Sequence, residues 1–257
     1  MGRFVEGEAD SVSDIRFDER VVLVTGSSSG IGEATARRFA SLGATVVINS
    51  ARSIEAGQRV ADELERAWYL QGDVSKDGVG ESMVASILER SGRLDVLVNN
   101  AGTTRVIAHH DLAAATVDVW REIFELNVFG TWALSVAAMG ALRETSGSIV
   151  NVSSIAGIRP TGSSIPYASS KAALNHMTVL LAKVVGPEVR VNAVAPGLID
   201  TPWTSDWNAI RGFVREVAPL KRSGTPDDVA DVVVALASSP YVTGQVIAVD
   251  GGLTIAT

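Results

Sequence analysis

The chain has 257 residues, of which 46% are apolar, and it carries a formal net charge of -7. An acidic chain lacks the basic face that nucleic acids require, so we expect no nucleic-acid partner. It contains no cysteine, which excludes disulfides and thiolate metal sites and fits a cytoplasmic protein.

The N-terminal segment, residues 1–18, is acidic and shows no apolar periodicity. We therefore expect a loose extension there, followed by one domain over residues 19–257. The segment lacks the basic and then apolar order of a signal peptide. The apolar stretches elsewhere are well short of a membrane span, so we expect no membrane partner.

Short β-branched runs then alternate with helical stretches. The runs that predict strands are 20–26, 44–50, 68–74, 94–100, 147–153, 189–196 and 245–251. Helical patterns lie at about 30–42, 53–66, 76–90, 112–143, 166–185 and 226–237. This alternation predicts an α/β fold: a single Rossmann-like, doubly wound domain with seven parallel strands and helices on both faces of the sheet.

A glycine-rich turn follows the first predicted strand. In "VVLVTGSSSGIG", Gly26, Gly30 and Gly32 stand between a strand and a helix. Small residues at this place let the backbone approach a pyrophosphate at a helix N-terminus. The spacing differs from the common G-x-G-x-x-G fingerprint, and a flexible Ser/Gly turn is the alternative. Its position at the first crossover favours a nucleotide site.

The stretch "PYASSK" at 166–171 contains a candidate acid–base pair. Pro166 predicts the first turn of a helix, so Tyr167 and Lys171, four residues apart, share one helix face. A free tyrosine has a pKa of about 10, and a nearby ammonium lowers it by stabilising the phenolate. Tyr167 is therefore a candidate general acid or base. The alternative is an exposed helical pair without a catalytic role.

Five motifs together resemble the short-chain dehydrogenase/reductase family. They are "TGSSSGIG" (25–32), "NNAG" (99–102), "NVSS" (151–154), "YASSK" (167–171) and "PGLIDT" (196–201). They follow the family's order and spacing, and the resemblance covers nearly the whole chain from about residue 18. The length matches the compact branch of the family, and the chain resembles its 3-ketoacyl-carrier-protein reductase-like members.

The resemblance implies a catalytic set of Asn127, Ser154, Tyr167 and Lys171. Hydride would pass between a nicotinamide and the carbon of a carbonyl or secondary alcohol, while Tyr167 exchanges a proton with the oxygen. Ser154 would bind that oxygen, and Ser153 is the structural alternative. Lys171 would also hold the nicotinamide ribose. Asn127 would hold a water for proton relay; otherwise it is a satisfied core polar group.

The second strand predicts which nicotinamide cofactor binds. An NAD-selective site needs a carboxylate after this strand, and "VVINSARS" has none. Arg52 could pair with a 2′-phosphate, so we expect NADP, with NAD or a merely solvated arginine as the alternative. Together the motifs assign the following residues to the cofactor: Gly26, Ser28, Ser29, Gly30, Ile31, Gly32, Ser50, Arg52, Ser53, Asp73, Val74, Asn99, Ala101, Gly102, Tyr167, Lys171, Pro196, Gly197, Ile199 and Thr201.

Residues at about 198–224 resemble the family's substrate lid. We expect Ile158, Trp203 and Trp207 to contact a small or medium hydrophobic carbonyl or alcohol compound. The tryptophans could instead pack the lid onto the body of the protein. We expect no metal site, because the adjacent His109 and His110 do not suit a shared metal face.

Three other functions stay open. A catalytically silent nucleotide-binding regulator of the same fold would usually lack the tyrosine or the lysine, and this chain has both. A dehydratase or epimerase is disfavoured by length. A 3-ketoacyl-thioester reductase is possible, although Glu188 stands where a base would help to dock an acidic carrier. The resemblance further implies a homotetramer or homodimer that packs through the long helices at 112–143 and 166–185.

Overall fold

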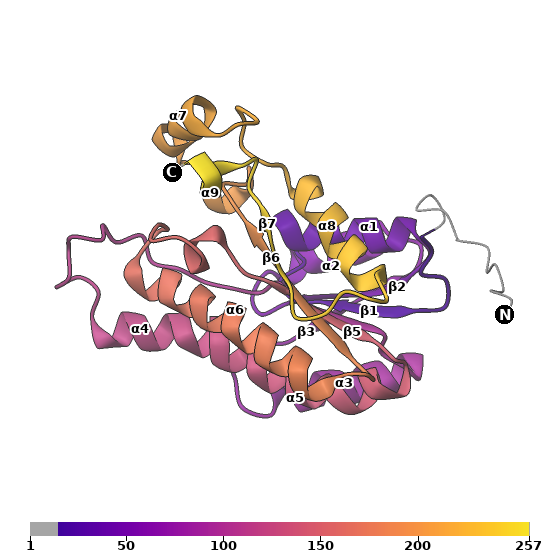
Figure 1. Ribbon diagram of the computed structural model, residues 1–257. Coiled ribbons are helices and arrows are strands. Elements are labelled where there is room, and N and C mark those ends of the chain that lie inside the picture. Colours follow the sequence, from indigo (N-terminus) through magenta and orange to yellow (C-terminus); the bar gives the residue numbers. More distant parts are fainter. Residues whose placement is uncertain (1–14, 257) are drawn as a thin grey trace, which may run out of the picture.

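Seven parallel strands form a single sheet through the centre of the molecule (Figure 1), in a computed structural model that describes residues 15–256. Their spatial order is β3-β2-β1-β4-β5-β6-β7, so the chain reverses direction across the sheet after β3. This arrangement confirms the predicted doubly wound α/β fold. The strands are β1 Val21–Val24, β2 Thr45–Ser50, β3 Ala67–Gln71, β4 Val96–Asn99, β5 Ser148–Val152, β6 Arg190–Pro196 and β7 Val246–Val249.

Helices cover both faces of the sheet. The α-helices are α1 Gly30–Ser41, α2 Ile54–Asp62, α3 Val79–Ser91, α4 Val117–Phe124, α5 Thr131–Glu144, α6 Ile165–Val185, α7 Asn208–Val217, α8 Pro226–Ser238 and α9 Leu253–Ala256. The first core packs α1, α2 and α8 against one face, and the second packs α3, α5 and α6 against the other. Successive strand residues serve opposite cores, because their side chains alternate: Val22 and Val24 face α1 and α8, whereas Leu23 faces the other layer.

The packed part of the chain begins earlier than the sequence predicts. Phe17 is fully buried, and its ring meets that of Phe39 edge-on at 4.9 Å between centroids. Its N–H donates to the carbonyl of Leu42. Phe17 therefore belongs to the first core and Ile15 packs against it, although their polar neighbours hide the apolar signal. The rest of the predicted extension, residues 1–14, lies outside the described residues.

One long helical run follows β4, over Val117–Glu144. It begins at residue 117 and not at 112, because Thr116 caps it and accepts a hydrogen bond from the N–H of Val119. A π-helical turn, Glu125–Gly130, interrupts it around Asn127. Among the described residues it is the one helix that is long and apolar enough to cross a membrane by length and composition, which the sequence analysis did not anticipate. It packs against α3 and β4, as the core helix of a globular layer does, so this is weak evidence for a membrane span.

The predicted lid is closed at its base. The Gly224 N–H donates to the Leu198 carbonyl at 2.9 Å, and the Asp200 N–H donates to the Gly224 carbonyl at 2.8 Å. Between these ends the chain forms a 3-10 turn at 202–204 and the helix α7, which the sequence analysis left unassigned. In Figure 1, α7 and α9 stand side by side beyond the sheet.

Candidate active site

A cleft of about 1340 Å³ opens where the strands end at their carboxyl termini. Pockets for single drug-sized ligands measure roughly 300–1,000 Å³, so this cleft has room for a dinucleotide and a second molecule. Its walls are the turn after β1, the ends of β2, β4, β5 and β6, the start of α6, and the lid. Ligands of doubly wound sheets bind at this edge.

The glycine-rich turn has a backbone shape that other residues rarely adopt. Gly26 and Gly30 have φ angles of 62° and 59°, in the left-handed region. At Gly32 a Cβ would overlap the carbonyl oxygen of Gly26 and the Asn100 side chain. The turn leads into α1, whose first N–H groups lack partners within the helix and point toward the cleft. This cradle fits a dinucleotide pyrophosphate.

The "NNAG" segment fixes the glycine turn from the neighbouring strand. Asn100 Nδ2 donates to the carbonyls of Thr25 and Gly26, at 2.9 and 3.0 Å. Asn99, which was predicted to contact the cofactor, faces the interior instead, where its Nδ2 donates to Asn151 and Ser135. Adjacent strand residues face opposite sides, and the sequence does not tell which of two asparagines faces the cleft.

The polar residues at the far end of the cleft come from β2 and the loop after β3. Arg52 and Ser53 are exposed and line the cleft, as a 2′-phosphate site requires. The Ser50 hydroxyl is paired with the Tyr69 hydroxyl at 2.9 Å, so it is less available than predicted. Lys76, which the sequence analysis did not select, adds a second cation to this wall.

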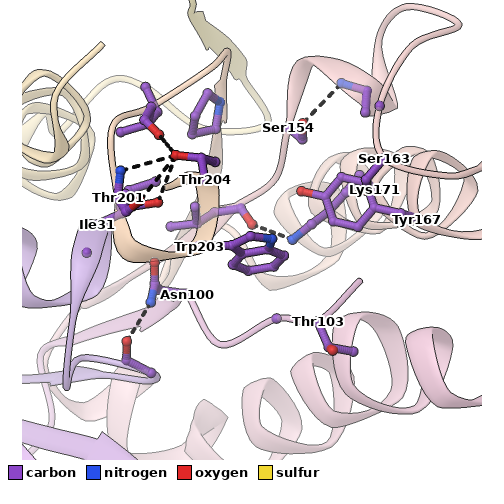
Figure 2. A pocket seen from close by; sticks show the side chains of 18 of the residues that line it. Ile31, Asn100, Thr103, Ser154, Ser163, Tyr167, Lys171, Thr201, Trp203 and Thr204 are labelled. Carbon is purple, nitrogen blue, oxygen red and sulfur yellow. Dashed lines mark hydrogen bonds between the residues drawn. The ribbon is translucent and has the colours of Figure 1, made fainter. Parts of the chain in front are cut away.

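Tyr167, Lys171 and Ser154 meet at the opposite end of the cleft. Ser164 caps α6 by accepting from the Tyr167 N–H, and Pro166 lies in the first turn, as predicted. Ser154 follows β5, and its Oγ accepts from the Ala156 N–H at 3.1 Å. Lys171 is 4% exposed, and Figure 2 shows its side chain beside the Tyr167 ring; its ammonium donates to the Val152 carbonyl at 2.9 Å.

The electrostatics of this trio differ from the prediction. Burial raises the pKa of Tyr167, and the hydrogen bond with Ser154 offsets part of that rise. Burial also lowers the pKa of Lys171 to about 8. The ammonium lies 5.8 Å from the centre of the phenol ring and is bonded to a backbone carbonyl, so the predicted lowering of the tyrosine pKa by lysine is not found in the protein alone. At neutral pH the phenol keeps its proton.

Asn127 lies next to the cleft without lining it. Its Oδ1 accepts from the Thr103 N–H at 2.8 Å, and its Nδ2 donates to the Thr103 carbonyl and to Ser170 Oγ, both at 3.0 Å. Both amide hydrogens are therefore used within the protein. The side chain holds the loop after "NNAG" in place, and its role in a water relay stays a prediction.

The lid supplies the apolar wall on the substrate side. The Trp203 ring faces Tyr167 edge-on, with 6.4 Å between centroids, and is labelled beside it in Figure 2. Trp207 and, from α7, Phe213 extend this wall; Phe213 was not predicted. Ile158, predicted to contact the substrate, is 43% exposed and does not line the cleft, whereas Ile155 does.

Most predicted residues come together in this one cleft. Those that line it are Gly26, Ser29, Gly30, Ile31, Ser50, Arg52, Ser53, Asp73, Val74, Ala101, Gly102, Ser154, Tyr167, Lys171, Pro196, Gly197, Ile199, Thr201, Trp203 and Trp207. Those that do not are Ser28, Gly32, Asn99, Asn127 and Ile158. Within residues 15–256, no group of three or more His, Cys, Asp or Glu residues is placed to hold a metal ion.

A dinucleotide cradle that faces a half-buried tyrosine beside a buried lysine is the site of a nicotinamide-dependent oxidoreductase. The chain belongs to the short-chain dehydrogenase/reductase family: residues 26–254 match a family model described as enoyl-(acyl carrier protein) reductase. This confirms the resemblance found in the sequence.

Individual relatives span nearly the whole chain. A protein of Streptomyces violaceoruber, provisionally named as ketoacyl reductase 2 of the granaticin polyketide synthase, is 58% identical over 90% of this chain and 95% of its own. The 3-oxoacyl-(acyl-carrier-protein) reductase of Thermotoga maritima is 39% identical over 94% and 100%. A crystal structure titled as a short-chain dehydrogenase/reductase, glucose/ribitol dehydrogenase, from Brucella melitensis has a TM-score of 0.87 at 33% identity, over 93% and 99%.

Proposed function

We propose that the protein reduces a ketone of an apolar substrate with NADPH, and that Tyr167 donates the proton. The observation that carries the proposal is the single cleft that joins the glycine cradle to Tyr167, Lys171 and Ser154. The nicotinamide supplies the hydride that forms the new bond to the carbonyl carbon. Tyr167 O–H gives its proton to the carbonyl oxygen, and the Ser154 hydroxyl donates to that oxygen as negative charge develops on it.

The protonation state of Tyr167 supports the reductive direction. A proton donor must be neutral at the start of the reaction, and burial raises the pKa of this phenol. Oxidation of an alcohol requires the phenolate, which the protein's own groups do not favour here. Lys171 Nζ lies 5.8 Å from the centre of the ring, and we propose that it binds the nicotinamide ribose hydroxyls.

Arg52 supports a preference for NADPH. It is exposed on the cleft wall after β2, and the residues that follow this strand, Ala51 to Ser53, include no carboxylate to bind the ribose hydroxyls of NADH. Ser53 and Lys76 lie on the same wall and could contact the 2′-phosphate with it.

The substrate class we favour is a 3-ketoacyl compound. Two relatives named as ketoacyl reductases span more than nine-tenths of their own length in the match. The apolar lid wall of Trp203, Trp207 and Phe213 suits an acyl or ring substituent on the reacting carbon.

We further propose that the protein acts in the cytoplasm as a homotetramer or homodimer. Large apolar side chains are exposed along α5 and α6 and the turn before α5, on the sides that do not face the sheet: Phe129, Trp132, Val136, Val179, Leu180 and Val184. A face of this kind is typical of an interface between subunits.

Turnover with two cofactors and several carbonyls tests the proposal. The protein is mixed with NADPH or NADH, and nicotinamide absorbance is followed with a ketoacyl thioester, a diketone, a steroid and a sugar. We expect NADPH oxidation with the thioester, and its loss in Tyr167→Phe while NADPH still binds by fluorescence titration. Full activity of that variant would refute the mechanism. Tight NADPH binding with no turnover on any substrate would favour the silent regulator.

A further inference from the structure

Asn175 extends the stripe of α6 that carries Tyr167 and Lys171. The three residues are four positions apart, so they lie near one another on the helix. Each meets the end of β5 or the segment that follows it. Tyr167 bonds with Ser154, and Lys171 Nζ donates to the Val152 carbonyl. Asn175 Nδ2 donates to the Gly157 carbonyl at 3.1 Å.

The Gly157 contact joins the Ser154 segment to α6, as does a second hydrogen bond, in which Ser153 Oγ donates to the Lys171 carbonyl at 3.3 Å. Ser154 begins this 3-10 turn: its carbonyl accepts from the Gly157 N–H at 3.0 Å, and its Oγ accepts from the Ala156 N–H. The turn is pressed against the helix, because a Cβ on Gly157 would lie 2.6 Å from the Lys171 backbone and 2.7 Å from Asn175 Nδ2. Within the turn the Ser154 hydroxyl is bonded to the Ala156 N–H, so its position depends on the position of the turn.

The stability of the folded protein does not explain why residue 175 is an asparagine. Its Oδ1 is buried and has no hydrogen-bond partner among residues 15–256. An unsatisfied buried acceptor costs about 1–3 kcal/mol, which an apolar residue would avoid. The donor side of the amide, bonded to the Gly157 carbonyl, is the feature that an apolar residue could not replace.

We propose that Asn175 is a positioning residue, which holds the Ser154 turn against α6 and thereby sets the place of the Ser154 hydroxyl relative to the Tyr167 phenol. The inference rests on the proposed roles of Ser154 and Tyr167. Asn175 does not line the cleft, so it acts through Ser154 and not on the substrate. The cofactor cradle lies on β1, β2 and β4, and loosening the turn leaves it unchanged.

The test is a mutant cycle on kcat with Asn175→Ala, Ser154→Ala and the double variant. We expect Asn175→Ala to lower kcat about tenfold, since small displacements of a catalytic group have effects of that order or larger. The KM of this variant for NADPH should stay within about twofold of the value for the unsubstituted protein. The double variant should be as slow as Ser154→Ala alone, because a residue that acts only through Ser154 has nothing left to position.

Asn192→Ala is the matched control. The Asn192 amide on β6 also holds backbone: its Nδ2 donates to the Val242 carbonyl at 2.8 Å and its Oδ1 accepts from the Gln245 N–H, both in the loop before β7 and outside the cleft. It should lower the melting temperature and leave kcat unchanged. If Asn175→Ala does not fold, Asn175→Leu fills the space without a donor and carries the same expectation.

The outcomes separate the two proposals. Full turnover of Ser154→Ala would refute the catalytic assignment on which the inference rests. A slow Ser154→Ala together with a normal Asn175→Ala would overturn only the role of Asn175. The role of Asn175 would also be overturned if the two losses in kcat multiply in the double variant, because Asn175 would then act independently of Ser154.

Discussion

Replacing Lys171 with methionine separates the stability cost of this lysine from its role in turnover. The side chain is almost completely buried, and its ammonium donates to the Val152 carbonyl. Burial lowers its pKa from 10.5 to about 8, so the charged lysine destabilises the folded protein relative to the unfolded chain. Methionine has a similar length and carries no charge. Lys171→Met therefore removes this cost together with the hydrogen bond.

The pKa difference sets the size and the pH range of the effect. At about 1.4 kcal/mol per pKa unit, the charged lysine costs about 3 kcal/mol at pH 7. Between pH 8 and 10.5 the unfolded chain binds more protons than the folded protein, so the cost is complete below pH 8 and disappears as the pH rises to 10.5. Loss of the hydrogen bond offsets about 1 kcal/mol. We expect Lys171→Met to be more stable by about 2 kcal/mol at pH 7 and to lose nearly all of this advantage at about pH 9.5.

The assay is urea unfolding at both pH values and one protein concentration, with turnover measured in parallel. Lys183→Met is the control, because Lys183 is on the same helix and exposed. Because its side chain is exposed, Lys183→Met removes a lysine from the helix without removing a burial cost. Turnover of Lys171→Met should fall by about 100-fold or more, since a charged donor is lost from the site. A stability difference that is the same at both pH values would refute the reasoning.

Three further changes test other parts of the molecule. Arg52→Ala should weaken NADPH binding about tenfold and leave NADH binding nearly unchanged, because only NADPH carries the 2′-phosphate; equal losses in fluorescence titrations would contradict the assignment. Gly32→Ala should abolish the binding of both cofactors, since its Cβ would overlap the Gly26 carbonyl and force the cradle open, and calorimetric titration would reveal any binding that remains. Leu180→Glu should convert the assembly into monomers in light-scattering measurements, whereas an unchanged mass would place the interface elsewhere.

The sequence predicts the sheet well, because its strands are apolar on both faces and alternate regularly with helices. It also locates Tyr167, Lys171 and Ser154 through motif spacing. The sequence does not predict features that depend on contacts between residues far apart in the chain. The choice between Asn99 and Asn100 depends on which side of β4 faces the cleft, and the paired hydroxyl of Ser50 depends on Tyr69 in the neighbouring strand.

The contacts of Asn127 and the helix α7 are two further features that the sequence does not predict. The amide of Asn127 is satisfied by Thr103, on a loop 24 residues away, and the π-helical turn around it has no signal in the sequence. The helix α7 lies in a segment that resembles a mobile lid, and its apolar residues Ile210 and Phe213 face the cleft while remaining about half exposed. Val214 of α7 is buried in a small cluster with Ile155, Ala218 and Leu253, so α7 is held by tertiary contacts that the sequence does not show.

The closed base of the lid has a consequence for how enzymes of this construction diversify. The two ends of the lid are joined by the backbone hydrogen bonds of Leu198 and Asp200 with Gly224. The lid is therefore attached to the body of the protein at two fixed points. The entropy of closing a loop grows only slowly with its length, by about 0.6 kcal/mol for each doubling. Residues between the anchors can be inserted, deleted or exchanged with little effect on the stability of the body. Changes in the accepted carbonyl can therefore accumulate in this segment while the proton-transfer apparatus on α6 stays the same.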